Sequence, residues 1–214
     1  MVYALENSKL YLITELVEDD SLNEVLFGDK NKTLIMSERL AIAEKICLAV
    51  VYLYSQTPVV IHRDIKPENI LISYDLKQVK LCDMDLCKIK TMNTVMTTMA
   101  GGLVQPGTPV NQAPEILVDR KSANIASDMW SLSCTLVELI GVCPIWNMLE
   151  DFDSPVQYIM DQMNVNAKSD GFHEHRSVAD TKLYCVLERG LSYKASDRPQ
   201  ASEIVDCLRS LIMT

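Results

Sequence analysis

The chain has 214 residues, enough for one domain with a substantial buried core. Hydrophobic residues make up 48% and charged residues 23%, which is ordinary for a globular protein, and the formal net charge is −9. This negative charge argues against nonspecific binding to nucleic acid or to an anionic membrane surface, so neither is expected as a partner.

Nothing in the sequence predicts export or membrane insertion. The first ten residues lack the basic segment and following apolar segment of a signal peptide. The longest apolar run, residues 46–54, is too short to cross a bilayer. We therefore expect a cytoplasmic location.

Cysteines are scattered along the chain, odd in number and mostly within apolar runs, which indicates reduced core thiols of an intracellular protein. His173 and His175 have no paired cysteines nearby, so we expect a solvated loop there and no zinc site. The cysteines are Cys47, Cys82, Cys87, Cys134, Cys143, Cys185 and Cys207.

A β-hairpin and a short helix are predicted at the N-terminus. Residues 2–5 and 10–14 favour strands on either side of a turn. Ser21 can then cap a helix over residues 22–27, which Gly28 closes.

A long helix follows, with Ser37 as its expected N-cap. Its apolar residues recur on one helical face, which predicts packing against the core rather than a cofactor site. These residues are Leu40, Ala43, Ile46, Cys47, Val50 and Leu53.

The stretch from Ile61 to Asn69, I-H-R-D-I-K-P-E-N, places polar groups on a loop between two short apolar runs that are typical of buried strands. Asp64 can accept a proton from an alcohol, and Lys66 can balance charge on a transferring phosphoryl group. Asn69 can give an oxygen to a hard cation. These are the residue types that chemistry at a phosphate requires.

A hairpin is predicted after this loop, and it supplies a second oxygen ligand. If its two strands pair antiparallel with Ile70 opposite Cys82, the next step places Asn69 opposite Asp83. Opposed residues lie about 4.5–5.5 Å apart at Cα. An amide and a carboxylate then meet at the open end of the hairpin, where one Mg²⁺ can bridge them.

The second half of the chain predicts a loop and a buried helix. Between Asp83 and Glu115 the sequence is rich in Thr, Met and Gly and has no clear period, which predicts a mobile loop. Ser127 can cap a helix over residues 128–140 that is apolar nearly all round and should form the buried axis of the domain.

Three further helices close the chain. Pro155 follows Ser154 at the start of a predicted helix to Met163, and residues 168–180 are polar and loop-like. Two amphipathic helices come last, over residues 181–188 and 201–213.

These motifs, in this order, resemble the eukaryotic-type protein kinase family. H-R-D-I-K-P-E-N at residues 62–69 looks like the catalytic loop. V-K-L-C-D-M-D at residues 79–85 is similar to the strand and D-F-G segment, although Met84 and Asp85 depart from Phe and Gly. Three later motifs follow in family order: G-T-P-V-N-Q-A-P-E at 107–115, D-M-W-S at 128–131 and D-R-P at 197–199. The resemblance covers nearly the whole chain.

The resemblance implies an α+β fold, mostly α-helical, with short β-hairpins at the catalytic site. Asp64 matches the catalytic base, Lys66 the residue that steadies the phosphoryl group, and Thr108 the threonine that bonds both. Asn69 and Asp83 match the magnesium ligands. Thr108 and Lys66 together favour Ser or Thr over Tyr as the acceptor residue. The resemblance also implies ATP and Mg²⁺ as cofactors and a protein as the substrate.

The same resemblance divides the chain into two parts. Residues 1–17 look like the last hairpin of the small lobe with the hinge, and residues 18–214 look like the helical C-lobe. The implied contacts to the nucleotide come from Glu15 and Val17 in the hinge and from Leu71. An edge hairpin is the alternative if the downstream motifs are set aside.

Further contacts are implied in the C-lobe. Asp128 would tie down the catalytic-loop backbone, with plain helix capping as the alternative, and Glu115 would form a buried ion pair with Arg198. A phosphate on a loop threonine would pair with Arg63 and order the loop, the alternative being a flexible loop that is never phosphorylated. The threonines are Thr91, Thr94, Thr97 and Thr98.

Parts of a complete kinase are missing from these 214 residues. No G-x-G-x-x-G lid is present, and Lys9, the only lysine before the hinge, stands in the wrong context for the ATP clamp. Removal of one preorganised charge-stabilising group typically costs about 10²–10³ in rate. Asp85 also adds a negative charge beside Asp83.

Two interpretations therefore stay open. The chain is the catalytic lobe of a serine/threonine kinase whose small lobe comes from a longer chain or a partner, or it is a pseudokinase-like interaction module or inactive fragment.

Overall fold

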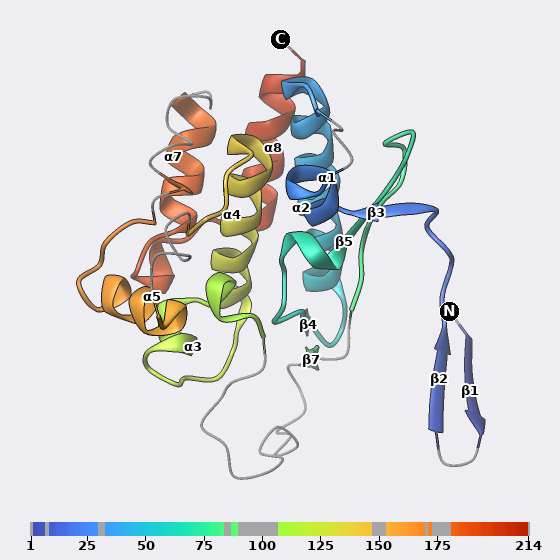
Figure 1. Cartoon of the computed structure of the whole chain (residues 1–214), viewed down its shortest axis with the longest axis horizontal. Coiled ribbons are helices and arrows are strands. Elements are labelled where there is room, and N and C mark those ends of the chain that lie inside the picture. Colours follow the sequence, from blue (N-terminus) through green and yellow to red (C-terminus); the bar gives the residue numbers. More distant parts are fainter. Residues whose placement is uncertain are drawn as a thin grey trace.

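The computed structural model describes residues 2–6, 9–29, 33–83, 87–89, 107–146, 153–169, 171–172 and 181–213 (Figure 1). It has the predicted α+β fold, mostly helical. Its strands are β1 (Val2–Glu6), β2 (Lys9–Ile13), β3 (Asp19–Ser21), β4 (Val60–Ile61), β5 (Ile70–Ser73), β6 (Val79–Leu81) and β7 (Lys88–Ile89). Its α-helices are α1 (Leu22–Phe27), α2 (Met36–Ser55), α3 (Pro114–Leu117), α4 (Ile125–Gly141), α5 (Pro155–Asn164), α7 (Thr181–Gly190) and α8 (Ala201–Ile212). Short 3₁₀ turns are η1 (Pro67–Asn69), η3 (Pro109–Asn111) and η5 (Ala195–Asp197).

The N-terminal hairpin stands apart from the helical body in Figure 1. β1 and β2 pair antiparallel with Val2 opposite Ile13, as the strand-favouring residues predict. Beyond β2, the carboxylate of Glu15 lies 3.0 Å from Lys80 Nζ on β6. This ion pair connects the segment after the hairpin to β6, an edge strand of the three-stranded sheet β3–β5–β6.

The caps of α1 are those predicted. Ser21 Oγ accepts a hydrogen bond from the backbone N–H of Glu24 at 3.3 Å, and the N–H of Gly28 donates to the carbonyl of Glu24 at 3.0 Å. A serine before the first apolar residue and a glycine after the last one therefore fix both ends of this helix.

The predicted caps of the two longest helices are wrong. α2 starts one residue before Ser37, and the carboxylate of Glu38 accepts from the backbone N–H of Ile35 at 2.9 Å. α4 starts after Asn124, and Ser127 Oγ accepts from the N–H of Asn124 at 2.9 Å. Ser127 is thus the third residue of the helix. In a capping box, the side chain at this third position accepts a hydrogen bond from the backbone N–H of the N-cap residue.

Helix α4 is the buried axis of the domain, as predicted. Every residue from Ser127 to Ile140 is buried, and α2 and α7 pack against the helix. α2 in turn packs along α8. Most of the predicted stripe on α2 lies in this core: Ala43, Ile46, Cys47 and Val50 are buried, and Leu40 packs against them, whereas Leu53 is only half-buried.

The register of the β5–β6 hairpin differs by one residue from the prediction. Ile70 is opposite Leu81, and the N–H of Cys82 donates to the carbonyl of Asn69 at 2.9 Å, so Asn69 faces Cys82 and not Asp83. The connecting loop is shorter than predicted, because the N–H of Ser73 already bonds the carbonyl of Gln78 at 3.0 Å.

The turn between β5 and β6 explains this shorter loop. Asp75 Oδ1 accepts from the N–H of Lys77 at 3.0 Å, and Ser73 Oγ accepts from the N–H of Gln78 at 2.9 Å. Leu76 has a positive φ of 59°. These side-chain bonds stabilise a tight turn that draws Gln78 into the ladder.

The C-terminal region contains the predicted helices, and three described residues of the predicted loop, Ser169, Gly171 and Phe172, are buried. The predicted polar loop over residues 168–180 is wrong at Phe172, which is fully buried and stacks on Tyr184 with ring centroids 4.9 Å apart. The two histidines of that loop, at 173 and 175, lie outside the described residues.

Two features concern the whole described part of the chain. All seven cysteines fall within it, and each carries a thiol. Across the same residues, no helix combines the length and the apolar character needed to cross a membrane.

Candidate functional site

The polar loop over residues 62–69 is held in place by a side chain of α4. The two carboxylate oxygens of Asp128 accept the backbone N–H groups of His62 at 2.7 Å and of Arg63 at 2.8 Å. Arg63 has a φ of 74°, which is uncommon for a residue with a side chain and is retained only where its surroundings fix it. Asp128 therefore fixes a strained turn directly before Asp64.

Asp128 itself is 1% exposed. Burial raises its pKa to about 6, although the N–H groups of Arg63 and His62 favour the ionised form. Both oxygens accept hydrogen bonds from amides, and a protonated carboxyl would lose one of these contacts. The loop geometry consequently requires the carboxylate.

His62 connects the loop to the end of β6. The N–H of Asp64 donates to His62 Nδ1 at 3.3 Å, so Nδ1 is the acceptor and Nε2 carries the proton that reaches the carbonyl of Cys82 at 3.1 Å. Burial lowers the pKa of His62, which favours this neutral tautomer. The imidazole thus joins the residue before Asp83 to the loop that carries Asp64.

Three side chains converge on the carboxylate of Asp64, which is 6% exposed. Its Oδ1 accepts both the N–H and the hydroxyl of Thr108, each at 3.0 Å. Its Oδ2 accepts Asn69 Nδ2 at 2.9 Å and lies 3.1 Å from Lys66 Nζ. The Lys66 ammonium also donates to the hydroxyl of Thr108, so the three predicted catalytic residues form one cluster.

The charge state of Asp64 follows from these contacts. Burial alone raises its pKa, but the hydrogen bond and positive charge of Lys66 and the two bonds from Thr108 outweigh burial and lower it. Asp64 is therefore ionised at neutral pH and can accept a proton.

Thr108 reaches this cluster because Gly107 precedes it. Gly107 has a φ of 116°, and a Cβ at this position would lie 2.9 Å from the carbonyl oxygen of Arg63. Only glycine permits this approach without displacement of the loop.

The two predicted metal ligands belong to the open end of the β5–β6 hairpin. Asn69 directly precedes β5, and Asp83 is two residues after β6. Asn69 Nδ2 donates to the carbonyl of Asp64 at 2.8 Å, which directs the amide oxygen away from that residue. Asp83, one residue beyond the partner of Asn69, is exposed and has a φ of 61°. An amide oxygen and a carboxylate are hard donors that fit Mg²⁺. No three His, Cys or acidic side chains gather as a metal site within the described ranges.

The three residues predicted to contact the nucleotide lie on one strand, β5, and on the segment that connects β2 to β3. Leu71 on β5 is opposite Lys80 on β6, and Lys80 in turn pairs with Glu15, so two of the three are linked through one lysine. Val17 is half-buried in the segment between β2 and β3.

A buried ion pair holds the segment that follows this site. Arg198 donates to both carboxylate oxygens of Glu115, at 2.7 and 2.8 Å, as the resemblance implied. The same guanidinium donates to the carbonyls of Ser192 and Ala126 and lies 5.2 Å from the ring of Trp130.

Comparison with known proteins agrees with this geometry. The family profile described as "Protein kinase domain" matches residues 2–207. The chain belongs to the protein kinase family. It is 29% identical over 214 residues to the human serine/threonine-protein kinase Nek10, a match that covers 98% of this chain and 17% of that protein.

Other kinases give similar matches over part of the chain. A probable serine/threonine-protein kinase of Dictyostelium discoideum is 33% identical over 150 residues, covering 64% of this chain and 22% of that protein. Serine/threonine-protein kinase SSN3 of Eremothecium gossypii is 33% identical over 144 residues, covering 66% and 24%. The chain thus spans about a fifth of the length of these kinases.

Two residues of this kinase chain contribute contacts that its sequence did not reveal. His62 belongs to the recognised motif, but its role as a bridge to Cys82 depends on the sheet register. Tyr54, at the end of α2, reaches Asp128 from a position with no local signal. The predicted phosphorylation sites, Thr91, Thr94, Thr97 and Thr98, and the two departures from D-F-G, Met84 and Asp85, lie outside the described residues.

Proposed function

We propose that this chain is the catalytic lobe of a serine/threonine protein kinase, which transfers the γ-phosphoryl group of ATP to hydroxyl groups of a protein. The observation that carries the proposal is the convergence of Lys66 and Thr108 on the ionised carboxylate of Asp64. The human and mouse Nek10 matches, which each cover 98% of this chain, carry the serine/threonine designation in their names, and this supports that acceptor class.

Each residue of the cluster has a separate task in this proposal. Asp64 orients the acceptor hydroxyl and takes its proton. Lys66, a cation within 3.1 Å of Asp64, stabilises negative charge on the phosphoryl group in transfer. Thr108 holds both side chains in place, since its hydroxyl donates to Asp64 and accepts from Lys66.

Nucleotide binding completes the proposed site. Asn69 and Asp83 would hold Mg²⁺, while Glu15, Val17 and Leu71 would contact the adenine. The bound metal would neutralise charge on the ATP phosphates. The support from the chain itself is the donor chemistry of the first pair and the link from Leu71 through Lys80 to Glu15.

We assign residues 1–17 to the last hairpin and hinge of the small lobe and residues 18–214 to the C-lobe. A glycine-rich lid and a clamping lysine are not among the 214 residues, so we assign them to a further segment or a partner. We also propose a cytoplasmic location, which the odd number of cysteines within apolar runs supports.

A pseudokinase-like interaction module is the second candidate. The substitution of Asp85 for the glycine of D-F-G favours it, because a side chain restricts the backbone and this one adds negative charge near Asp83. The transcript sequence upstream of Met1 distinguishes the two: an in-frame glycine-rich strand and a strand lysine favour the enzyme.

A binding experiment tests the nucleotide site. Titration calorimetry with Mg-ATP is performed on the wild type, on Asp83→Ala and on Asp206→Ala, which removes an exposed acid from α8. We expect weaker binding for Asp83→Ala alone. Equal affinities for the wild type and Asp83→Ala would remove the nucleotide-site hypothesis.

A further inference from the structure

A tyrosine on α2 contacts the carboxylate that anchors the catalytic loop. The hydroxyl of Tyr54 lies 3.3 Å from Asp128 Oδ2, the oxygen that also accepts the N–H of His62. Asp128 therefore accepts hydrogen bonds from two backbone amides of the loop and from the Tyr54 side chain of α2, which packs beside α4.

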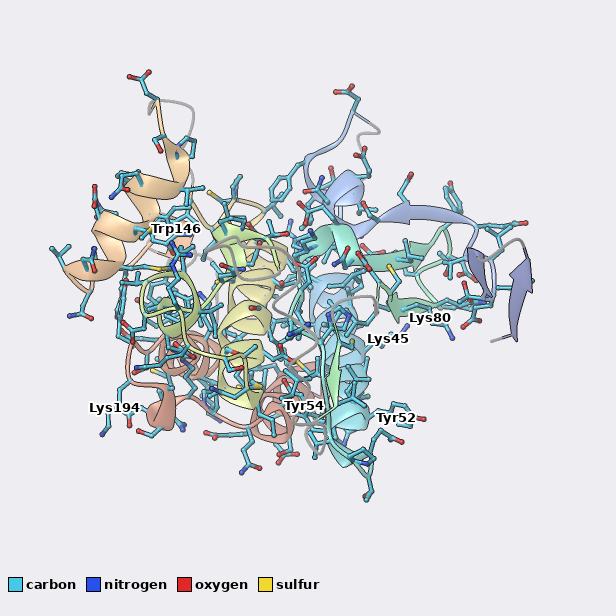
Figure 2. All side chains as sticks on the ribbon, turned by 90° about the horizontal axis from the view of Figure 1, so that it is seen from below. Lys45, Tyr52, Tyr54, Lys80, Trp146 and Lys194 are labelled. Atoms are coloured by element: carbon cyan, nitrogen blue, oxygen red, sulfur yellow. The ribbon has the colours of Figure 1, made fainter. Side chains whose placement is uncertain are left out.

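The contact differs from that of the other tyrosine near the end of the same helix. Figure 2 labels both, and Tyr52 projects away from the body while Tyr54 lies on the side of α2 nearer α4. Tyr52 is 65% exposed, whereas Tyr54 is half-buried. Burial raises the pKa of Tyr54 well above its ordinary value, so the phenol keeps its proton and can donate at neutral pH.

The chemistry of a buried carboxylate gives this bond a function. Asp128 accepts the amides of both His62 and Arg63 only when it is ionised, and burial opposes ionisation. A phenol donor stabilises the ionised carboxylate more strongly than the protonated carboxyl, because hydrogen bonds to a charged acceptor are the stronger ones. The groups that face Asp128 include Tyr54 from α2 and His62 and Arg63 from the loop.

We propose that Tyr54 is a positioning residue for Asp64. Its phenol helps to hold Asp128 as the carboxylate that fixes the backbone of His62 and Arg63, the two residues before Asp64. Tyr54 acts through Asp128 and touches neither substrate nor nucleotide. The effect of Tyr54 on catalysis by Asp64 rests on the proposed kinase activity, but the effect of Tyr54 on the ionisation of Asp128 does not.

The test is an NMR titration of the Asp128 side-chain carboxyl carbon from about pH 4 to about pH 8. It compares the wild type with Tyr54→Phe, which removes only the hydroxyl, and with Tyr52→Phe as the matched control on the same helix. For Tyr54→Phe we expect the Asp128 midpoint to rise by about one pH unit. We also expect the amide protons of His62 and Arg63 to exchange about tenfold faster. Tyr52→Phe should match the wild type in both.

A second measurement needs no variant. In the wild type, the ¹³C chemical shift of Tyr54 Cζ should change with pH, with the same midpoint as the Asp128 carboxyl carbon. An unchanged Asp128 titration and amide exchange in Tyr54→Phe, or a Tyr54 ring that does not respond to Asp128, would overturn the proposal. Thermal unfolding of each variant checks that it is folded.

Kinetics separate this inference from the proposed function. If the protein transfers phosphate, Tyr54→Phe should move the acidic limb of the kcat profile to higher pH by the same amount and leave KM for the protein substrate unchanged. An absence of transfer in the wild type would count against the proposed function, while the titration would still decide the role of Tyr54.

Discussion

Arg198 and Glu115, 83 residues apart in sequence, form a two-point ion pair with N···O distances of 2.7 and 2.8 Å. The guanidinium side chain is fully buried, and the carboxylate side chain is 10% exposed. The pair ties the segment after Thr108 to the turn before α8. Breaking such a pair from one side leaves an uncompensated buried charge.

We therefore expect Arg198→Ala to lower the free energy of unfolding by about 3–5 kcal/mol. The matched control is Arg189→Ala, which breaks the exposed pair with Glu203 and should cost at most about 1 kcal/mol. Urea unfolding followed by circular dichroism measures both. Similar small losses for the two variants would show that the buried pair does not hold the segment.

Thr108 should matter for activity through its hydroxyl. Thr108→Ala removes one bond to Asp64 and the acceptor for Lys66, and the loss of such an orienting partner typically reduces activity about 10–100-fold. Thr108→Ser keeps the hydroxyl and should retain most of the activity. The measurement is the phosphotransfer rate at saturating ATP, and a Thr108→Ala enzyme as fast as the serine variant would contradict this role.

Glu138 predicts a pH dependence of stability. It is buried on α4, its Oε1 accepts the N–H of Ile145 at 2.9 Å, and burial raises its pKa to about 7. A carboxyl group whose pKa is higher in the folded state than in the unfolded state adds to the free energy of unfolding while that carboxyl is protonated. Its contribution is complete below about pH 4.5 and is lost as the pH rises through about 7.

Glu138→Gln should remove this dependence, because the amide does not ionise and its oxygen can still accept from Ile145. Between about pH 5 and about pH 8 the wild type should lose up to about 3 kcal/mol of unfolding free energy relative to the variant. Urea unfolding at both pH values provides the measurement, with Asp206→Asn as an exposed control. Parallel pH profiles for wild type and Glu138→Gln would exclude an ionisation of Glu138 in this range.

Local chemistry made part of the fold predictable. The caps at Ser21 and Gly28 depend only on nearby backbone groups, so the sequence was sufficient for α1. Ser127 was misplaced because a serine suits both the cap and the third position of a helix, and Asn124 took the cap. Phe172 was assigned to a loop because its partner Tyr184 comes from a later helix.

In the candidate site too, features set by neighbouring residues could be predicted, and features set by distant contacts could not. Asp64 and Lys66 were identified from one short motif, whereas the place of Thr108 came only from the family resemblance. The opposition of Asn69 and Asp83 was wrong, because side-chain bonds at Asp75 shorten the turn and shift the register. The contact of Tyr54 with Asp128 joins residues 74 positions apart and has no local signature.

The most direct measurement of the central claim is the rate of phosphate transfer from Mg-ATP to a protein with accessible Ser and Thr residues, such as casein. It compares the full-length natural protein with its Asp64→Asn variant, which keeps the shape of the side chain and removes the proton acceptor. We predict that Asp64→Asn lowers the rate about 10²–10⁴-fold while Asp206→Asn leaves it unchanged. Equal rates for the wild type and Asp64→Asn would contradict a catalytic role for Asp64.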